Sequence, residues 1–396
     1  LVKGMGERQE DVEEVLLGPS KKAAFDKDGN PTRAAEGFAR SKGSRVEALE
    51  VVETPKGEYL QLTRTVIGKQ TRELLPSLLK EIILSLSFPK SMKWGTNQHS
   101  FARPIQWLVA LFNGEVIELE HEGIVAGNKT YGHRFMAPDP VVSEDSNTYE
   151  EMLESVSVIG DFGRRRERVQ AEILAAVGDA DFGVAASVAV DEGLLDTNTN
   201  LVESPFGVCG RFDSKFLEVP DEVLITSMRE HQKYFPVVSE DGALLPGFVA
   251  VNNTRVLKPG LTREGHERVL RARLEDAYFF FESDKKRRLD DRVDDLTGVI
   301  FQAKLGSITE KTERIIKLTR LLGEMLAPDL VDDACRAALL CKADLTTDMV
   351  GEFPSLQGVM GSAYAVHDGE NSTVAAAIRE HYMPLRSGAE LPESEA

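Results

Sequence analysis

The spacing of apolar residues predicts a long amphipathic helix across residues 269–292. Four apolar side chains, three or four positions apart, fall on one helical face: Leu270, Leu274, Ala277 and Phe281. Two pairs of opposite charges four residues apart, Arg271 with Glu275 and Glu282 with Lys286, would support the exposed face. From periodicity alone, a solvated helix face is favoured over a nucleic-acid contact for the basic residues of this segment.

Residues 1–135 carry both helical and strand patterns, and we expect them to form an N-terminal α+β domain. The acidic stretch 7–17 predicts a helix, and residues 48–67 predict a hairpin. An apolar stripe predicts a helix at 74–86. The Asn-Gly pair at 113–114 lies between two apolar runs and predicts a tight turn, because both residues tolerate positive φ.

A second α+β domain is predicted for residues 136–260. Asp161 is placed to cap a helix over 164–177, and a Pro-Asp pair opens another helix at residue 221. The Asp-Gly pair at 241–242 predicts a second hairpin turn between apolar strands.

Beyond residue 260 the pattern is almost entirely helical. We expect residues 261–300 and residues 301–396 to be helical. Ser307 and Glu310 have the spacing of a capping box, in which each side chain satisfies a free backbone N–H. The helix that follows has apolar residues on one face: Ile315, Leu318, Leu322 and Met325. The predicted fold class is therefore multidomain α+β, with two mixed α/β domains followed by a helical one.

The chain carries a net charge of −18, which argues against indiscriminate nucleic-acid binding because an acidic body repels phosphate. Between Arg263 and Arg292, however, nine basic residues face eight acidic ones, so this window is nearly neutral. A contact with RNA would therefore have to be specific and geometric.

The sequence argues against a membrane protein and against a secreted protein, and we expect a soluble, cytoplasmic protein. No apolar run approaches the length of a membrane span, and no signal-peptide pattern is present. The three cysteines are far apart and favour reduced thiols. The chain begins with Leu1 in the middle of a pattern, so we expect a fragment of a longer polypeptide.

Motifs for common catalytic chemistries are missing from the sequence: GxGxxG, the P-loop, HExxH and GxSxG. The only His-Asp dipeptide, His367-Asp368, precedes a glycine that indicates a helix end, and the seven histidines have no metal-binding spacing. Lys233 is followed by two aromatic residues, Tyr234 and Phe235. These three could contact RNA through charge and stacking, or the rings could simply pack at a helix end.

Eight motifs in order and at characteristic spacing resemble the β subunit of the bacterial heterotetrameric glycyl-tRNA synthetase. They are SMKWG, FARPIQWLVALF, YGHRF, HQKYFPV, VLRARLEDAYFFFESDKK, LGSITEKTERI, CKADLTTDMVGEF and LQGVMGSAYAVHDGE. The resemblance covers essentially the whole chain.

This resemblance implies a division of labour in an α2β2 assembly. The α subunit would use ATP, Mg²⁺ and glycine, while the β subunit would bind and position tRNA(Gly), with no cofactor and no complete active site of its own. It also implies that 136–260 is a B3/B4-like domain and that 301–396 is an HD-like domain, incomplete here. Residues 261–300 would then be a helical connector between these two domains. The C-terminal anticodon-binding domain of the family is expected to be absent from this chain.

An HD domain usually carries a histidine in one helix and a His-Asp pair in a later one. Lys311 or Thr312 stands at the first position here, and Lys342 to Asp344 at the second. Only Asp344 could ligate a metal, and we expect Lys342 to repel a cation and to pair with Asp344 instead. The resemblance therefore implies a degenerate HD fold without a metal.

The candidate RNA-binding residues are Lys233 and the basic residues of the nearly neutral window: Arg263, Arg268, Arg271, Arg273, Lys285, Lys286, Arg287 and Arg288. Two alternatives stay open. One is a metal-dependent phosphohydrolase that uses His367 and Asp368. The other is an editing module in 136–260 that deacylates a mischarged tRNA.

Overall fold

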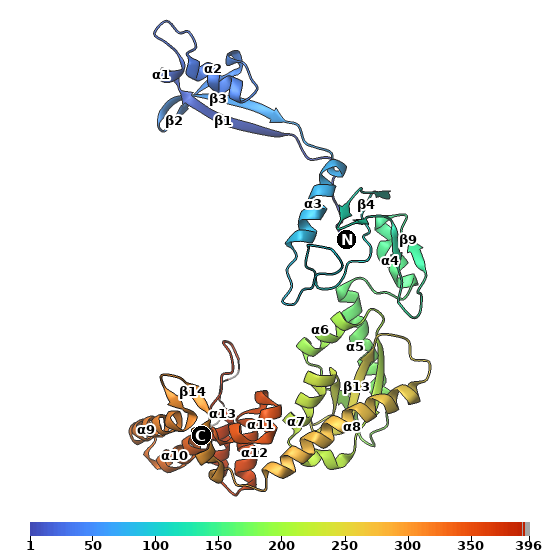
Figure 1. Ribbon diagram of the computed structural model, residues 1–396, viewed down its shortest axis with the longest axis vertical. Coiled ribbons are helices and arrows are strands. Elements are labelled where there is room, and N and C mark those ends of the chain that lie inside the picture. The colour runs from blue at the N-terminus through green and yellow to red at the C-terminus, as the bar shows by residue number, and fades with distance from the viewer. Residues whose placement is uncertain (390, 393–396) are drawn as a thin grey trace. The chain divides into compact units, whose positions relative to one another are not determined.

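The computed structural model describes residues 1–389 and 391–392, and the chain divides into two compact units (Figure 1). Unit 1 comprises Leu1–Gly132 and Asp139–Met152, and unit 2 comprises His133–Pro138 and the chain from Leu153 onward. Both units mix helices with antiparallel strands, so the prediction of a multidomain fold with both kinds of element is confirmed.

Unit 1 contains a three-stranded antiparallel sheet, a long helix and three short hairpins. The sheet has the order β1-β3-β2, with β1 Val12–Ser20, β2 Glu50–Thr54 and β3 Gly57–Val66. The helices are α1 Lys21–Ala24, α2 Arg33–Ser41 and α3 Thr71–Ser85, and α4 Tyr149–Ser155 begins in unit 1 and ends in unit 2. The hairpin strands are β4 Leu111–Phe112, β5 Glu115–Val116, β6 Glu120–His121, β7 Ile124–Val125, β8 Lys129–Tyr131 and β9 Pro140–Val142.

The predicted hairpins and the helix at 74–86 are confirmed, but the predicted helix at 7–17 is wrong. Asn113 and Gly114 have φ of 50° and 80°, as a tight turn between β4 and β5 requires. The stretch after residue 11 is instead strand β1, in which Val12 pairs with Val66. A hydrogen-bonded partner so distant in sequence outweighs the local helical pattern.

Unit 2 begins with a four-stranded antiparallel sheet in the order β10-β12-β13-β11. Its strands are β10 Ala186–Val188, β11 Phe206–Arg211, β12 Phe235–Ser239 and β13 Leu244–Asn252. The accompanying helices are α5 Phe162–Gly178, α6 Glu192–Leu201 and α7 Asp221–Thr226, which continues as a π-helix over Ser227–Gln232. Asp161 accepts a hydrogen bond from Arg164 N at 2.7 Å, so its predicted role as the cap of α5 is confirmed.

The two faces of this sheet contribute to different hydrophobic cores, because successive residues of a strand point to opposite sides. Val249 packs with Ile173 of α5, whereas Phe248 packs with Leu270 of α8, which spans Pro259–Asp284. Figure 1 shows α8 as one long helix running past β13. The predicted stripe of α8 is buried, with Leu270, Leu274 and Ala277 fully inaccessible.

Helix α8 does not have the predicted limits. It begins at Pro259 and ends at Asp284, so residues 285–289 form a turn before a 3-10 helix over Asp290–Gly298. Neither predicted i,i+4 ion pair forms among the described residues; Lys285 bonds instead to Glu282, at 2.6 Å. At this end of the helix, the buried side chain of Asp284 accepts hydrogen bonds from the backbone N–H groups of Asp348 and Met349.

The rest of unit 2 is helical apart from the small hairpin of β14 Ile300–Gln302 and β15 Gly306–Ser307. Its helices are α9 Ile308–Leu326, α10 Val331–Leu340, α11 Asp348–Glu352, α12 Val359–His367 and α13 Ser372–Glu380. The capping box of Ser307 and Glu310 is confirmed at the start of α9. The apolar face of α9 is largely exposed over its second half, where Met325 is 72% accessible.

Candidate nucleic-acid interface

The four candidate arginines of α8 are exposed, but they do not share one face of the helix. Arg268 and Arg271 are three residues apart and lie on the same side, whereas Arg273 lies on the other. Arg263 is engaged in an ion pair with Glu267 at 3.9 Å. The helix thus offers one adjacent arginine pair and one isolated arginine.

The second basic cluster, Lys285 to Arg288, is only half available. Lys285 is bonded to Glu282 and lies over the ring of Phe281. Arg287 donates to the carboxylate of Asp295, and this hydrogen bond raises the pKa of the guanidinium. Lys286 and Arg288 are exposed, and neither has an ion pair among the described residues. Two of the four side chains therefore stabilise the turn after α8.

Lys233 is not part of a stacking site. It has a left-handed backbone with φ of 58°, and its Nζ donates to the carbonyl of Glu230 at 2.9 Å. The neighbouring Tyr234 and Phe235 are 6% and 0% exposed, so neither ring is open to a base. Both rings pack in the hydrophobic cores of unit 2, as the alternative of two packed aromatics predicts.

A basic and aromatic surface that sequence reasoning missed lies where two loops of unit 2 meet. The His133 Nε2–H donates to the carbonyl of Asn253, while its Nδ1 accepts from the backbone of Phe135. Arg255 N contacts Met136 Sδ at 3.4 Å, which holds the same loops together. Part of the signal is the YGHRF motif, which contains His133, Arg134 and Phe135.

The side chains of this loop surface point outward. Phe135 is 79% exposed, and Arg134 and Arg255 are exposed as well. Arg134 and Phe135 line a pocket of about 640 Å³, together with Arg165 and Asn200. An open ring beside guanidinium groups is the arrangement on which unpaired bases stack. We call Arg134, Phe135, Arg255 and the pocket the loop surface.

The pocket of the loop surface offers no nucleophile–base pair for the alternative function, the deacylation of a mischarged tRNA. Both nitrogens of His133 are occupied by backbone groups. Arg165 donates to the carbonyls of Thr199, Ile159 and Gly160. These polar groups fix the loops, so they are not free to move a proton.

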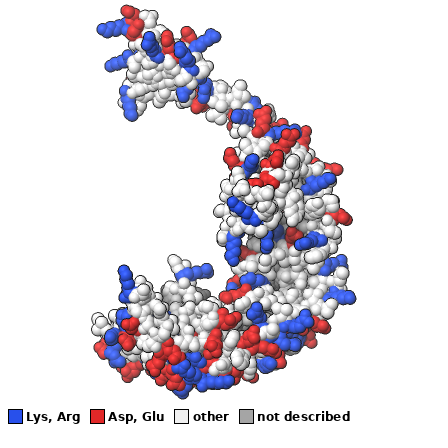
Figure 2. Space-filling model, viewed as in Figure 1, with Lys and Arg blue, Asp and Glu red and all other residues white. Residues whose placement is uncertain are grey.

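Charge on the visible face of the molecule is mixed. In Figure 2, acidic and basic side chains are interleaved around the place that α8 occupies in Figure 1. Such interleaving weakens the local positive potential, so the basic side chains of this face act mainly through short-range contacts.

The expected pair of Lys342 and Asp344 does not form. Lys342 Nζ donates to His381 Nε2 at 2.7 Å, whereas Asp344 Oδ2 accepts from Gly358 N and Gly361 N at 2.5 and 3.0 Å. Lys342 precedes a 3-10 turn over Ala343–Thr346 and Asp344 lies within it, and their side chains have different partners. Burial raises the pKa of Asp344 to about 6 and lowers that of Lys342 to about 8.

The phosphohydrolase alternative finds no site at His367-Asp368. As predicted, α12 ends at His367. Asp368 Oδ2 accepts a hydrogen bond from Leu289 N at 2.6 Å, and His367 is exposed. Across residues 1–389 and 391–392, no three His, Cys, Asp or Glu side chains gather closely enough to hold a metal.

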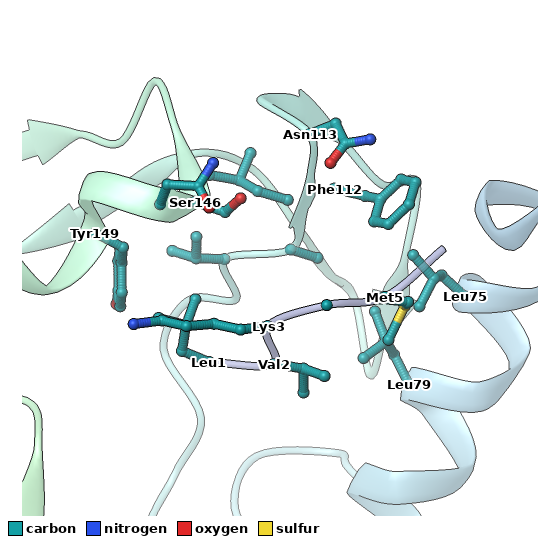
Figure 3. A pocket seen from close by; sticks show the side chains of 15 residues that line it. Leu1, Val2, Lys3, Met5, Leu75, Leu79, Phe112, Asn113, Ser146 and Tyr149 are labelled. Atoms are coloured by element: carbon teal, nitrogen blue, oxygen red, sulfur yellow. The ribbon is translucent and has the colours of Figure 1, made fainter. Parts of the chain in front are cut away.

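Unit 1 has a pocket of its own, of about 450 Å³ (Figure 3). Figure 3 shows Met5 beside Leu75 and Leu79 of α3, with Phe112 above them. Its described lining includes no carboxylate, histidine or cysteine. This mainly apolar pocket therefore lacks an acid–base pair for catalysis.

Comparison with known proteins identifies relatives along the whole chain. The model of the family "Glycyl-tRNA synthetase beta subunit" matches residues 1–396. The glycine–tRNA ligase beta subunits of Geobacter sp. (strain M21) and Citrifermentans bemidjiense are 49% and 50% identical over 394 residues, which is 100% of this chain. That of Syntrophus aciditrophicus is 47% identical over 393 residues, or 99% of the chain.

The chain spans 57% of the length of the first two relatives and 56% of the third. No helix of the described residues is both long and apolar enough to cross a membrane. With a family model matched from residue 1 to residue 396, the chain belongs to the glycyl-tRNA synthetase β-subunit family.

Proposed function

We propose that this chain binds tRNA(Gly) and positions it for aminoacylation by an α subunit in the cytoplasm. The α subunit would supply the site for ATP, Mg²⁺ and glycine, within an α2β2 assembly. The observation that carries the proposal is the family match along the whole chain, whose relatives are named as β subunits of a ligase.

The RNA contacts fall into two classes that can be separated by experiment. Arg268, Arg271, Arg273, Lys286 and Arg288 are exposed charges suited to phosphate. The loop surface adds the open ring of Phe135, which is suited to stacking on an unpaired base. Arg263, Lys285 and Arg287 already have acidic partners and would contribute less.

The phosphate contacts are tested by the salt dependence of tRNA binding to the complex with the α subunit. Replacing Arg268 and Arg271 by Ala removes two charges, and each lost phosphate contact is expected to reduce the slope of log K against log [salt] by about 1. Arg287→Ala is the matched control, because Arg287 is bonded to Asp295. If the double variant keeps the wild-type affinity and slope, α8 does not contact the RNA backbone.

Stacking on the loop surface is tested by Phe135→Ala. We expect tRNA binding to weaken by about 1–3 kcal/mol with an unchanged salt slope, because a ring contributes no charge. Phe135→Tyr keeps the ring and should retain the affinity. Equal binding by the Ala and wild-type chains would remove this residue from the interface.

A further inference from the structure

A pocket in the helical part of unit 2 contains two lysines and is distinct from the loop surface. It has a volume of about 650 Å³ and lies between α9, α10 and the end of α13. Lys311 and Lys342 line it, together with His381 and Tyr382. Much of the remaining wall is alanine, which leaves the space open: Ala334, Ala337, Ala338 and Ala377.

Lys342 is a buried cation without a carboxylate partner. It is 6% exposed, and no acidic oxygen of the described residues lies within salt-bridge distance of its Nζ. Its contacts are the neutral Nε2 of His381 and the ring of Tyr382, 3.6 Å away. Burying an ammonium group is costly unless an anion compensates it. The fold therefore keeps a buried positive charge at this wall that no carboxylate of the described residues bonds directly.

The acceptor role of His381 is fixed by its other nitrogen. Its Nδ1–H donates to the carbonyl of Ile378 at 2.6 Å, so Nε2 carries the lone pair that faces Lys342. Burial and the nearby Lys342 lower the pKa of His381 to about 4, which keeps the ring neutral near pH 7. Neutral imidazole cannot balance the lysine charge.

Lys311 adds a second positive charge to the same pocket. Its Nζ lies 4.0 Å from the ring centre of Phe301, and it has no acidic partner among the described residues. Glu380 is the one carboxylate on the described lining, which also includes the two lysines. Asp344, which is close in sequence, directs one oxygen to Gly358 and Gly361.

We propose that this pocket binds a small molecule that carries an oxyanion, a phosphate or carboxylate group, between Lys342 and Lys311. An ammonium group has three N–H donors, so Lys342 can bind the anion and keep its bond to His381. The alanine wall accommodates the uncharged part of the ligand, and the anion relieves the repulsion between the two lysines.

The test measures binding of inorganic phosphate and of acetate to the full chain by calorimetry and by the shift in Tm. Wild type is expected to bind at least one of them, and the tighter binder identifies the class of oxyanion. Lys342→Met is expected to weaken binding by about tenfold or more, because a charge-assisted hydrogen bond is lost. Lys317→Met, on the exposed side of α9, is the matched control.

Two further variants keep the test decisive if Lys342→Met fails to fold. Lys311→Gln changes a half-exposed side chain and should also weaken binding, while Glu380→Gln should strengthen it by removing a like charge. No Tm shift in wild type, or equal shifts in wild type, Lys342→Met and Lys311→Gln, would overturn the proposal.

The pH dependence gives a second readout. Burial lowers the pKa of Lys342 to about 8, so the affinity should fall as pH rises above 8 and the amine loses its proton. The other groups that face Lys342 are Lys311, Cys341, Asp344, Glu380, His381 and Tyr382. Cys341 has its pKa raised to about 11, and His381 stays neutral in this range. An affinity that is flat from pH 7 to 9 would contradict the role of Lys342.

Discussion

Asp284 at the end of α8 is a buried carboxylate with four hydrogen-bond donors. It accepts from Arg292 Nη2 at 3.2 Å, and from Asp348 N, Met349 N and Tyr364 Oη at 3.0 Å. The two backbone donors belong to the first turn of α11, where a negative charge is favourable. One side chain thereby holds three segments of unit 2 together.

Removing this carboxylate is expected to be costly. Asp284→Ala should lower the free energy of unfolding by about 3–5 kcal/mol, because the buried guanidinium of Arg292 would lose its anion. Asp284→Asn keeps the shape but not the charge and should cost less. Urea denaturation measures both variants, and a loss below about 1 kcal/mol for Asp284→Ala would contradict this account.

Asp344 predicts a pH dependence of stability. Burial raises its pKa in the fold to about 6 from the ordinary 3.8, so the fold favours the protonated form. Its contribution to stability is therefore full below pH 3.8 and is lost as pH rises through 6. Relative to Asp344→Asn, wild type should lose about 2 kcal/mol of unfolding free energy between pH 4 and pH 7. Urea titrations at both pH values check this, and a constant difference would refute it.

At the scale of elements, α8 is stabilised through its stripe rather than its charges. Leu274 is fully buried against both the sheet and the helical part, whereas Leu261 on the same helix is 66% exposed. We expect Leu274→Ala to lower the unfolding free energy by about 2–5 kcal/mol through cavity formation. Leu261→Ala is the matched control and should change it by less than about 0.5 kcal/mol. Similar losses in thermal or urea unfolding would argue against a packing role.

Features set by neighbouring residues could be predicted from the sequence, and features set by distant partners could not. The turn at Asn113-Gly114, the Asp161 cap and the Ser307 box depend on a few adjacent residues. Strand β1 depends on pairing with β3, about fifty residues later, so its local pattern predicted a helix instead. Lys342 bonds to His381, which is 39 residues away. Sequence proximity predicted Asp344 as its partner instead.

In the candidate site, too, only the features that depend on neighbouring residues could be predicted. Exposure of the α8 arginines could be predicted, because the buried stripe fixes which sides of the helix face water. The engagement of Arg287 by Asp295 could not, since it depends on the turn after α8. The loop surface arises only when residues 133–136 meet residues 253–255.

At the scale of the whole molecule, the hydrophobic cores are confined to one unit each. Ile117 and Ala126 share a core within unit 1, while Leu224 and Leu274 share one within unit 2. Separate cores can unfold in separate transitions. We therefore expect urea unfolding, followed by far-UV circular dichroism, to show more than one transition.

Two variants assign these transitions. Ile117→Ala should lower the midpoint of one transition only, and Leu274→Ala that of the other, because each residue is buried in its own core. A single transition that both variants shift equally would show that the units unfold together.

The path of the chain between the units restricts how the protein can be dissected. His133–Pro138 belongs to unit 2, although it lies between two segments of unit 1. A fragment that starts at Leu153 would leave the Asn253 carbonyl without the imidazole of His133. A fragment that stops at Gly132 would remove β9, the partner of β8. Exchange of either unit between relatives would therefore need three splice points rather than one, and the two units are best inherited together.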